Sequence, residues 1–418
     1  MTTEIHPIEP DEFAAFRRVN DAAFGWQPSD EDIEADRPLL EADRTLAIYD
    51  AGRIVATAAA FSFALTLPGL TSTGPDATSP TASVAGVTGV GVLPTHRRRG
   101  LLRALMRRQL DDVRARGESM AVLTASESVI YERFGYGLST SVLGIDIDPR
   151  HGAFARPVEY PGRLTLLEHN AATELLPTVY DRWRRRQPGA LNRSDARWRH
   201  TLRGARTPQD GASAIFCVAY EPAPGQVDGV AIYRVRNQWT DGIASNALLL
   251  RELFAVTPMA YAALWQYLLS VDLINSVHCP NRPVDEPLRW LLADPRRLRV
   301  TRRTDDLWVR IVDIPAALST RRYGVEDSLV LEISDPFLPD NAARYALEGG
   351  PNGAACRPTT ATADLVLSVA DLGAIFLGGV RPGALAYAGR VVEQSTGALR
   401  RADALFATDR APYCGTPF

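Results

Sequence analysis

The sequence contains no lysine, and all 46 of its basic residues are arginine. A P-loop for nucleoside triphosphates needs a lysine beside the β and γ phosphates, so this absence excludes that class of phosphate site. Cysteine is scarce as well. The cysteines lie far apart without a Cys-x-x-Cys pair, so we expect neither a disulfide scaffold nor a metal site from Cys217, Cys279, Cys356 and Cys414.

An excess of basic charge and long apolar runs are also missing. The net charge of −3 leaves no basic face for nucleic acid. The N-terminal residues have neither the basic nor the apolar region of a signal peptide. The stretch after Arg53 is uncharged, but its apolar part ends at Pro68 and is too short to span a bilayer. We therefore expect a cytoplasmic protein without nucleic-acid or membrane partners.

A chain of 418 residues is too long for one hydrophobic core, so two or three domains are expected. Strand and helix patterns alternate through residues 1–150 and again through 151–300, which predicts an α/β fold with mixed sheets. In the second segment a strand runs straight into a helix at Pro258, without an arginine-rich turn. We interpret this segment as a degenerate copy of the first, and two unrelated segments are the alternative. The pattern changes again in residues 301–418.

Local signals predict individual elements. In the first segment these are helices over 11–24 and 29–37, strands over 45–49 and 53–67, a loop over 68–80, a strand ending at Val92, a helix from about Gly100 to Arg116, a strand over 119–125, a turn at 126–134 and a hairpin ending at Asp148. Pro177 is tolerable only in a first helical turn, which predicts a helix that starts close to it. The tail over 399–418 is expected to be turn-rich and tucked against the protein.

The most informative segment runs from Val90 to Met106, where a strand leads through an arginine- and glycine-rich turn into a helix near Gly100. That order gathers free backbone N–H groups and the positive end of a helix dipole at one point, which suits a pyrophosphate without a metal ion. The Gly-x-Gly-x-x-Gly pattern of dinucleotide folds is absent. An arginine-rich helix start on the surface, without a ligand, is the competing interpretation.

The turn Arg97-x-x-Gly100-x-Leu102 resembles the pyrophosphate loop of the GNAT superfamily of N-acetyltransferases, although Leu102 replaces the usual small residue. The resemblance implies that acetyl-CoA, as co-substrate, lies along this strand, turn and helix and reaches the end of the next strand. A glycine in the strand permits close approach of the pantetheine arm. The predicted cofactor-binding residues are Val90, Gly91, Val92, Arg97, Arg98, Arg99, Gly100, Leu101, Leu102, Arg103, Ser126 and Glu127.

The segment from Ile130 to Gly137, Ile-Tyr-Glu-Arg-Phe-Gly-Tyr-Gly, resembles a second GNAT motif, in which the first tyrosine often protonates the departing thiolate. That role falls on Tyr131, and Tyr136 is expected to be structural. A phenol of pKa about 10 is a weaker acid than a thiol of about 8.5, so a hydrogen bond to the developing thiolate is the better description. A half-buried aromatic side chain without catalytic role is the alternative for Tyr131.

With a degenerate second copy, a third α/β domain and a C-terminal phenylalanine, the whole chain resembles the Eis (enhanced intracellular survival) acetyltransferases of actinobacteria. The resemblance implies two GNAT-like domains in tandem, over 1–150 and 151–300, and a sterol-carrier-protein-like domain over 301–418. It also implies an acetyl-CoA-dependent N-acetyltransferase, assembled as a homo-hexamer, whose acceptors are amines of aminoglycosides or lysine side chains.

The same resemblance implies that the terminal α-carboxylate, here on Phe418, is the general base. An ordinary terminal carboxyl, of pKa about 3.5, is a poor base, and desolvation beside aromatic groups would improve it. Seven acids between Asp30 and Asp43 are consistent either with an acidic mouth for a polycation or with a solvated helix face. Two other functions stay open: a non-catalytic binder of a lipid or acyl chain, and transfer of a longer acyl group from its CoA ester.

Overall fold

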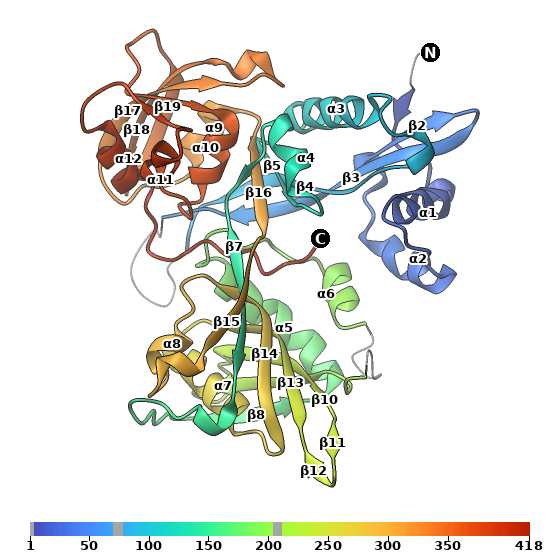
Figure 1. Cartoon of the computed structure of the whole chain (residues 1–418), viewed down its shortest axis with the longest axis vertical. Coiled ribbons are helices and arrows are strands. Elements are labelled where there is room, and N and C mark those ends of the chain that lie inside the picture. Colours follow the sequence, from blue (N-terminus) through green and yellow to red (C-terminus); the bar gives the residue numbers. More distant parts are fainter. Residues whose placement is uncertain (1–3, 70–77, 204–210) are drawn as a thin grey trace.

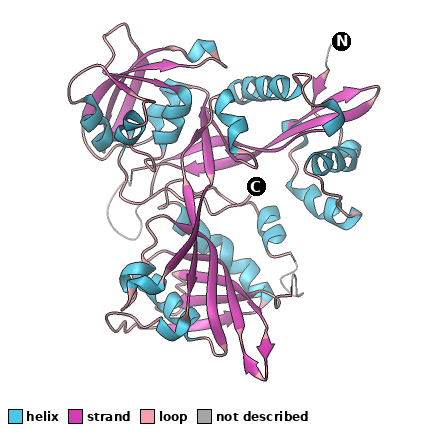
Figure 2. Cartoon of the chain, viewed as in Figure 1, coloured by secondary structure: helices cyan, strands magenta, loops and turns pink. Residues whose placement is uncertain are grey.

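The computed structural model describes residues 4–69, 78–203 and 211–418, which form three units, each built on a β-sheet with helices packed on it (Figure 1, Figure 2). Most of the predicted loop over 68–80 lies outside the described residues. No helix within these ranges is long and apolar enough to cross a membrane. Within the same ranges, no group of three or more His, Cys, Asp or Glu side chains is arranged to hold a metal ion.

The first sheet contains seven strands in the order β1-β2-β3-β4-β5-β16-β6. Their bounds are β1 (Ile5–His6), β2 (Thr45–Asp50), β3 (Arg53–Thr66), β4 (Thr81–Val92), β5 (Met120–Thr124), β16 (Leu307–Ile311) and β6 (Gly137–Leu138). β4 and β5 run parallel, and the other neighbours run antiparallel. The strands predicted over 45–49, 53–67 and 119–125, and the one ending at Val92, are confirmed.

Helices cover both faces of this sheet. They are α1 (Phe13–Ala23), α2 (Asp30–Asp36), α3 (Leu101–Ala115) and the single turn α4 (Ser128–Tyr131). Phe13 of α1 packs in one cluster with Ala47 of β2, whereas Leu105 of α3 packs in another with Ile48. Because neighbouring residues of a strand point to opposite faces, α1 and α3 lie on opposite sides of the sheet. The predicted cap at Ser29 is confirmed, since its hydroxyl accepts a hydrogen bond from the backbone of Asp32.

The second sheet also has seven strands, in the order β15-β7-β14-β13-β10-β9-β8. A separate two-stranded hairpin lies between β10 and β13 in the chain. The strands are β15 (Arg299–Asp305), β7 (Ser141–Ile147), β14 (Ile274–Pro283), β13 (Asn246–Ala255), β10 (Gly229–Arg236), β9 (Phe216–Glu221) and β8 (Arg163–Leu167), and the hairpin is β11 (Trp239–Thr240) and β12 (Ile243–Ala244). Its helices are α5 (His169–Arg184), α6 (Asp195–Thr201), α7 (Pro258–Ser270) and α8 (Leu288–Leu291).

The helix predicted to start close to Pro177 begins earlier. α5 starts at His169, so Pro177 lies in its interior. The reason is tertiary packing, because Ala172 of the first turns joins Leu176 and Val179 in a buried cluster against β9 and β10. The apolar face therefore stabilises a helix that the proline alone disfavours.

Two strands belong to sheets outside the segments in which the sequence places them. β7 lies within residues 1–150 but pairs with β14 and β15 in the second sheet, and β16 lies within 301–418 but fills the first sheet between β5 and β6. The predicted hairpin ending at Asp148 is therefore wrong. The backbone N–H groups of Ser139 and Thr140 both donate to Leu307, so β16 occupies the place beside β6 that a hairpin partner would take.

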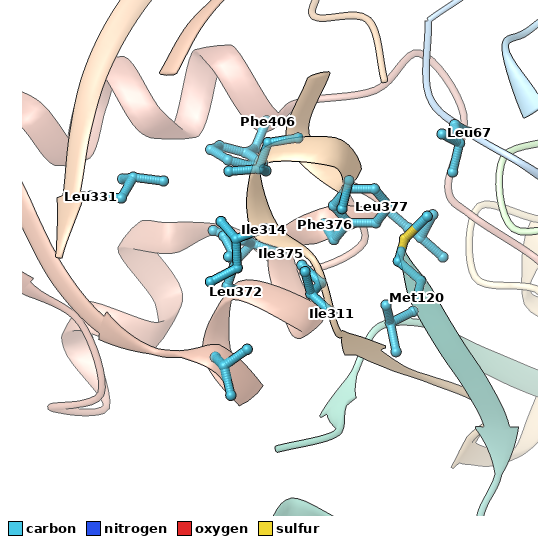
Figure 3. Packing of buried hydrophobic residues seen from close by; sticks show 14 of the residues in the cluster. Leu67, Met120, Ile311, Ile314, Leu331, Leu372, Ile375, Phe376, Leu377 and Phe406 are labelled. Carbon is cyan, nitrogen blue, oxygen red and sulfur yellow. The ribbon is translucent and has the colours of Figure 1, made fainter. Parts of the chain in front are cut away.

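The third unit has a five-stranded sheet in the order β19-β18-β17-β20-β21. Its elements are β17 (Asp327–Ser334), β18 (Ala343–Gly350), β19 (Gly353–Pro358), β20 (Leu365–Ser368), β21 (Val392–Glu393), α9 (Ile314–Thr320), α10 (Val369–Phe376), α11 (Pro382–Tyr387) and α12 (Ala398–Phe406). Its core continues into the first sheet: Figure 3 shows Met120 and Ile311 close to Phe376 and Leu377. The turn-rich prediction for 399–418 is wrong for its first part, because Leu405 and Phe406 are buried and extend α12 across that core.

Candidate active site

The first sheet splits between β4 and β5. Within the part of the chain that the structure describes, the two strands pair at only two positions, Ala85 with Ala121 and Gly86 with Val122. Beyond Gly86, β4 continues to Val92 with β3 alone as its partner. A β-bulge at Gly89, whose φ is 58°, changes the direction of the last residues of β4. The sheet therefore opens a gap whose β4 side carries the predicted residues Val90, Gly91 and Val92.

The space beside Gly91 does not face an open groove. A Cβ on Gly91 would lie 3.0 Å from Cβ of Ala23 and 3.2 Å from the side-chain nitrogen Nδ2 of Asn20, and both residues are on α1. The missing side chain therefore makes room for α1. This replaces the predicted reason for a glycine here, which was close approach of the pantetheine arm, and leaves the backbone of β4 as the part exposed to a ligand.

The turn between β4 and α3 forms an anion cradle. Arg98 and Gly100 both have left-handed backbones, with φ of 64° and 82°, and Gly100 is the N-cap of α3. The backbone N–H groups of Leu101, Leu102 and Arg103, in the first turn of α3, have no carbonyl acceptor within the helix, and among the described residues no side chain caps them. Such a row of free donors at a helix N-terminus, together with the helix dipole, suits a diphosphate. The cradle thus fits the pyrophosphate of coenzyme A.

The side chains around this cradle have different partners. Arg97 donates to the carbonyl of Ala23 at 3.1 Å, and Arg99 lies 3.7 Å from Asp50. Arg103 stacks on Phe337 of the third unit, 5.3 Å from the ring centroid. The remaining predicted residues keep their expected places: Leu101 and Leu102 begin α3, and Ser126 and Glu127 are exposed between β5 and α4.

Tyr131 lies next to the point where the sheet splits. It is 6% exposed and packs in one cluster with Ala85, Val87 and Leu123 of β4 and β5. Burial, followed by the charge of Glu127, raises the pKa of Tyr131 to about 12. The phenol of Tyr131 is therefore protonated at neutral pH.

Tyr136 occupies a different environment. Its ring meets that of Tyr131 with centroids 5.8 Å apart, and its side chain is fully buried. Among the described residues its hydroxyl has no hydrogen-bond partner, and burial raises the pKa of Tyr136 above its ordinary value. This agrees with the structural role predicted for Tyr136.

Phe418 reaches the same strand from the other side. Its ring packs against Phe63, and a Cβ on Gly86 would lie 3.3 Å from it. Gly86 points to the face of β4 opposite that of Ala85 and Val87, because successive residues of a strand alternate. Phe418 and Tyr131, the two predicted catalytic residues, therefore lie on opposite faces of β4 at its last pair with β5.

The tail before Phe418 is held by the second unit. Arg193 donates to the carbonyl of Gly415 at 2.9 Å and to the hydroxyl of Thr416 at 3.0 Å, and Tyr180 bonds the same hydroxyl at 2.8 Å. Arg197 donates to the carbonyl of Pro417 at 2.9 Å. Figure 1 shows the C-terminus between the first and second units. The predicted tucked tail is confirmed for these last residues.

A cavity of about 1470 Å³ opens beside Phe418. Its walls come from α1, α2 and β3 of the first unit and from α5, α6 and β13 of the second. Its charged lining contains acids and bases: Glu31, Asp32, Asp36, Glu41, Glu174 and Glu252, and Arg17, Arg197, Arg199, Arg203 and Arg251. The second-unit residues among them were not predicted, because no sequence signal shows which distant segments meet at one cavity.

The acid-rich stretch is not a free acidic mouth. Each of its seven carboxylates has a partner: Asp30 with Arg18, Glu31 and Asp32 with Arg203, Glu34 with Arg37, Asp36 with Arg17 and His200, Glu41 with Ser62, and Asp43 with Arg116. Ion pairs neutralise most of the charge that the sequence placed there. Attraction of a polycation by this stretch is correspondingly weaker than its composition indicates.

Comparison with known proteins gives the same architecture. An acetyltransferase (GNAT) domain family matches residues 4–139, a second acetyltransferase (GNAT) domain family matches 189–311, and a sterol carrier protein domain family matches 314–415. The N-acetyltransferase Eis of Mycobacterium tuberculosis is 35% identical over 423 residues and is aligned over 98% of each chain. The chain belongs to the Eis family of GNAT N-acetyltransferases.

Further relatives extend this result. An uncharacterized N-acetyltransferase of Streptomyces avermitilis is 39% identical and aligned over 99% of both chains. The crystal structure of Eis1 from Mycobacterium abscessus is similar over the full length of both chains, with a TM-score of 0.86 and 36% identity. A GCN5-related N-acetyltransferase from Kribbella flavida, at 22% identity and a TM-score of 0.76, shares the fold. As an Eis-family enzyme the chain is an N-acetyltransferase, and acetyl-CoA, which GNAT acetyltransferases use, suits the cradle at Gly100.

Proposed function

We propose that this Eis-family enzyme transfers the acetyl group of acetyl-CoA directly to an acceptor amine, with Tyr131 as general acid and the carboxylate of Phe418 as general base. The observation that carries the proposal is the arrangement of these two residues on opposite faces of β4, where the sheet splits. An amine that enters from the cavity meets the Phe418 side, and a thiol held along β4 and the Gly100 cradle leaves on the Tyr131 side.

The residues of the chain then have separate tasks. The carboxylate of Phe418 orients the ammonium group of the acceptor and accepts its proton, directly or through a water. The nitrogen lone pair forms the new bond to the acetyl carbonyl carbon while the carbon–sulfur bond breaks. Tyr131, as the acid, donates a hydrogen bond to the sulfur and stabilises the negative charge that develops on it as the thiolate leaves. General acid catalysis of this kind contributes roughly 10² to 10⁴ in rate.

We also propose that polyamine-type acceptors, such as aminoglycosides or exposed lysine side chains, enter this cavity. Its volume of about 1470 Å³ supports the proposal, since small-molecule pockets commonly measure about 300 to 1,000 Å³. We further propose homo-hexameric assembly, which the family resemblance implies, and a cytoplasmic location, which the widely separated cysteines favour. Light scattering of the purified enzyme tests the first, and fractionation of cells tests the second.

The deciding experiment extends the chain beyond Phe418. We expect a few appended residues to abolish release of CoA with a kanamycin-type acceptor, because the carboxylate is then an amide. Cleavage of the extension back to Phe418 by a site-specific protease is the matched control and is expected to restore turnover. Full activity of the extended enzyme would contradict the role of the carboxylate. A donor series from acetyl-CoA to longer acyl-CoA esters measures the chain length in the same assay.

A further inference from the structure

We propose that Thr57 and Asn20 are positioning residues for acetyl transfer. They hold the β-bulge of β4 at Gly89, and the bulge presents the backbone N–H of Val90 to the thioester of acetyl-CoA. The inference rests on the proposed transfer from acetyl-CoA along β4. Both side chains act through the backbone of β4 rather than by binding the acceptor.

The bulge lies between two regular pairs of β3 and β4. Thr57 pairs with Gly91, and Ala59 pairs with Thr88. Two residues of β4, the first of them Gly89, therefore face a single residue of β3. A bulge of this kind interrupts the ladder of hydrogen bonds, so its backbone groups need other partners.

Two buried polar side chains supply such a partner. The hydroxyl of Thr57 donates a hydrogen bond to the carbonyl of Gly89 at 2.9 Å, and the side-chain nitrogen of Asn20 donates to this hydroxyl at 3.4 Å. Thr57 is the one polar residue between Val55 and Phe61. Burying a hydroxyl or an amide is unfavourable unless it is hydrogen-bonded. Their bonds to each other and to Gly89 offset this cost and fix the bulge.

The opposite face of the sheet holds the same place. The side chain of Gln109, buried on α3, donates to the carbonyl of Ala59 at 2.9 Å, beside the bulge. α1 carries Asn20 and α3 carries Gln109, so the helices on both faces bind side chains or backbone at the bulge. The N-terminus of α3 also forms the cradle at Gly100. The bulge is therefore fixed relative to the proposed diphosphate site.

The direction of the Gly89 carbonyl determines where the next N–H points. A trans peptide is planar, so the N–H of Val90 points away from this carbonyl and from Thr57 on β3. The alternation along the strand agrees. The N–H of Leu93 donates to Val55 of β3, and N–H groups of successive residues point to opposite edges of a strand. Val90, three residues earlier, therefore faces the edge from which β5 has separated.

A donor at that edge acts on the reacting carbonyl. As the acceptor nitrogen bonds to the acetyl carbon and the carbon–sulfur bond weakens, negative charge develops on the carbonyl oxygen. A fixed N–H stabilises this charge, and removing one such donor costs about 10² to 10³ in kcat. Its contribution depends on its direction. Side chains that fix the peptide after Gly89 therefore control the rate without touching the cofactor.

The experiment removes the hydroxyl of Thr57 while keeping the shape of its side chain. We expect Thr57→Val to lower kcat for CoA release with a kanamycin-type acceptor about tenfold or more, and Thr57→Ser to stay within about twofold of wild type. The Kd of CoA, which lacks the acetyl group, changes little in both. Asn20→Leu acts in the same direction by a smaller factor, because its bond is longer. Thr320→Val, which removes an exposed hydroxyl of α9, is the matched control.

Infrared spectroscopy of bound acetyl-CoA, isotope-labelled at the acetyl carbonyl, tests the same point without an acceptor. A hydrogen bond to this carbonyl lowers its stretching frequency. We expect a lower frequency in the wild-type enzyme and in Thr57→Ser than in Thr57→Val. This measurement needs no turnover, so it distinguishes a failure of this inference from a failure of the proposed function.

The results decide as follows. An unchanged kcat in Thr57→Val, or the wild-type carbonyl frequency in that variant, overturns the inference. A parallel loss of kcat, CoA affinity and thermal stability assigns Thr57 to packing alone and also overturns it. If Thr57→Val does not fold, Asn20→Leu is judged by the same criteria. Absence of turnover with every amine, together with the expected frequency difference, contradicts the proposed function and supports the positioning role.

Discussion

The ring of Phe418 meets the ring of Phe63 edge-on, with the two centroids 5.2 Å apart and the planes at 66°. Gly86 makes this contact possible. A Cβ at Gly86 would lie 2.4 Å from the ring of Phe63 and 3.3 Å from that of Phe418. The absence of a side chain at Gly86, where β4 and β5 separate, therefore determines the position of Phe418, the proposed base.

Gly86→Ala should displace both rings. We expect a destabilisation of about 1–3 kcal/mol from overpacking and a fall in kcat of about tenfold or more, because the carboxylate of Phe418 moves with its ring. Thermal unfolding and CoA release measure the two effects. Gly324→Ala is the control, since a Cβ there meets no atom within 4 Å. Unchanged turnover in Gly86→Ala would show that the position of Phe418 is not critical.

Tyr131→Phe should lower kcat by roughly 10² to 10⁴ while the affinity for acetyl-CoA changes little. Removing the hydroxyl deletes the proton donor but keeps the ring that packs on Ala85 and Val87. Tyr387→Phe, at 99% exposure, is the control. Steady-state kinetics and equilibrium binding of acetyl-CoA separate the two quantities.

The raised pKa of Tyr131 gives a pH prediction. Because its pKa is about 12 in the folded enzyme and about 10 in the unfolded chain, Tyr131 keeps its proton to high pH. Its contribution to stability is complete below about pH 10 and is lost as the pH rises toward 12. The stability difference between wild type and Tyr131→Phe should shift in that window, as urea unfolding at several pH values would show. A difference independent of pH would contradict the raised pKa.

Gly100→Ala should weaken acetyl-CoA binding. The φ of 82° is strained for alanine by about 1–2 kcal/mol, and relief of that strain would turn the free N–H groups of the cradle away from the diphosphate. We expect a higher KM for acetyl-CoA and an unchanged KM for the acceptor. Gly117→Ala carries the same strain, at φ of 74°, beyond the other end of α3 and controls for stability alone.

Asp335→Ala should destabilise the enzyme by about 3–5 kcal/mol, because it leaves Arg310 as an unpaired buried cation. Both side chains are fully buried, 2.8 Å apart, and the pair joins β16 in the first sheet to the third unit. Glu348→Ala, which breaks the exposed pair with Arg357, should cost less than about 1 kcal/mol. Calorimetry of the two variants makes the comparison.

Local patterns predicted the first unit well. The uncharged run that forms β3, the cap at Ser29 and the glycine before α3 each act over a few neighbouring residues, so the sequence alone predicts them. The cofactor cradle was predictable for the same reason, since a strand, a turn and a helix N-terminus are consecutive in the chain.

Long-range pairing was not predictable. Nothing in Leu307–Ile311 shows that it inserts beside β5, because the residues of a buried strand do not specify which strand lies next to it. Arg193 and Arg197 likewise carry no signal that they bind the tail at residues 415–417. The position of Phe418 came from family resemblance, and its contacts with Phe63 and Gly86 depend on a fold that brings residues more than 300 positions apart together.

The place of β16 also governs the order of assembly during synthesis. The first sheet is completed by residues 307–311, so about three quarters of the 418 residues must leave the ribosome before it can close. Until then β5 presents an open edge on the nascent chain, a state prone to wrong pairing and to capture by chaperones. An enzyme with this interleaved sheet folds late, and a gene fragment that encodes the first GNAT match alone yields an unfinished sheet.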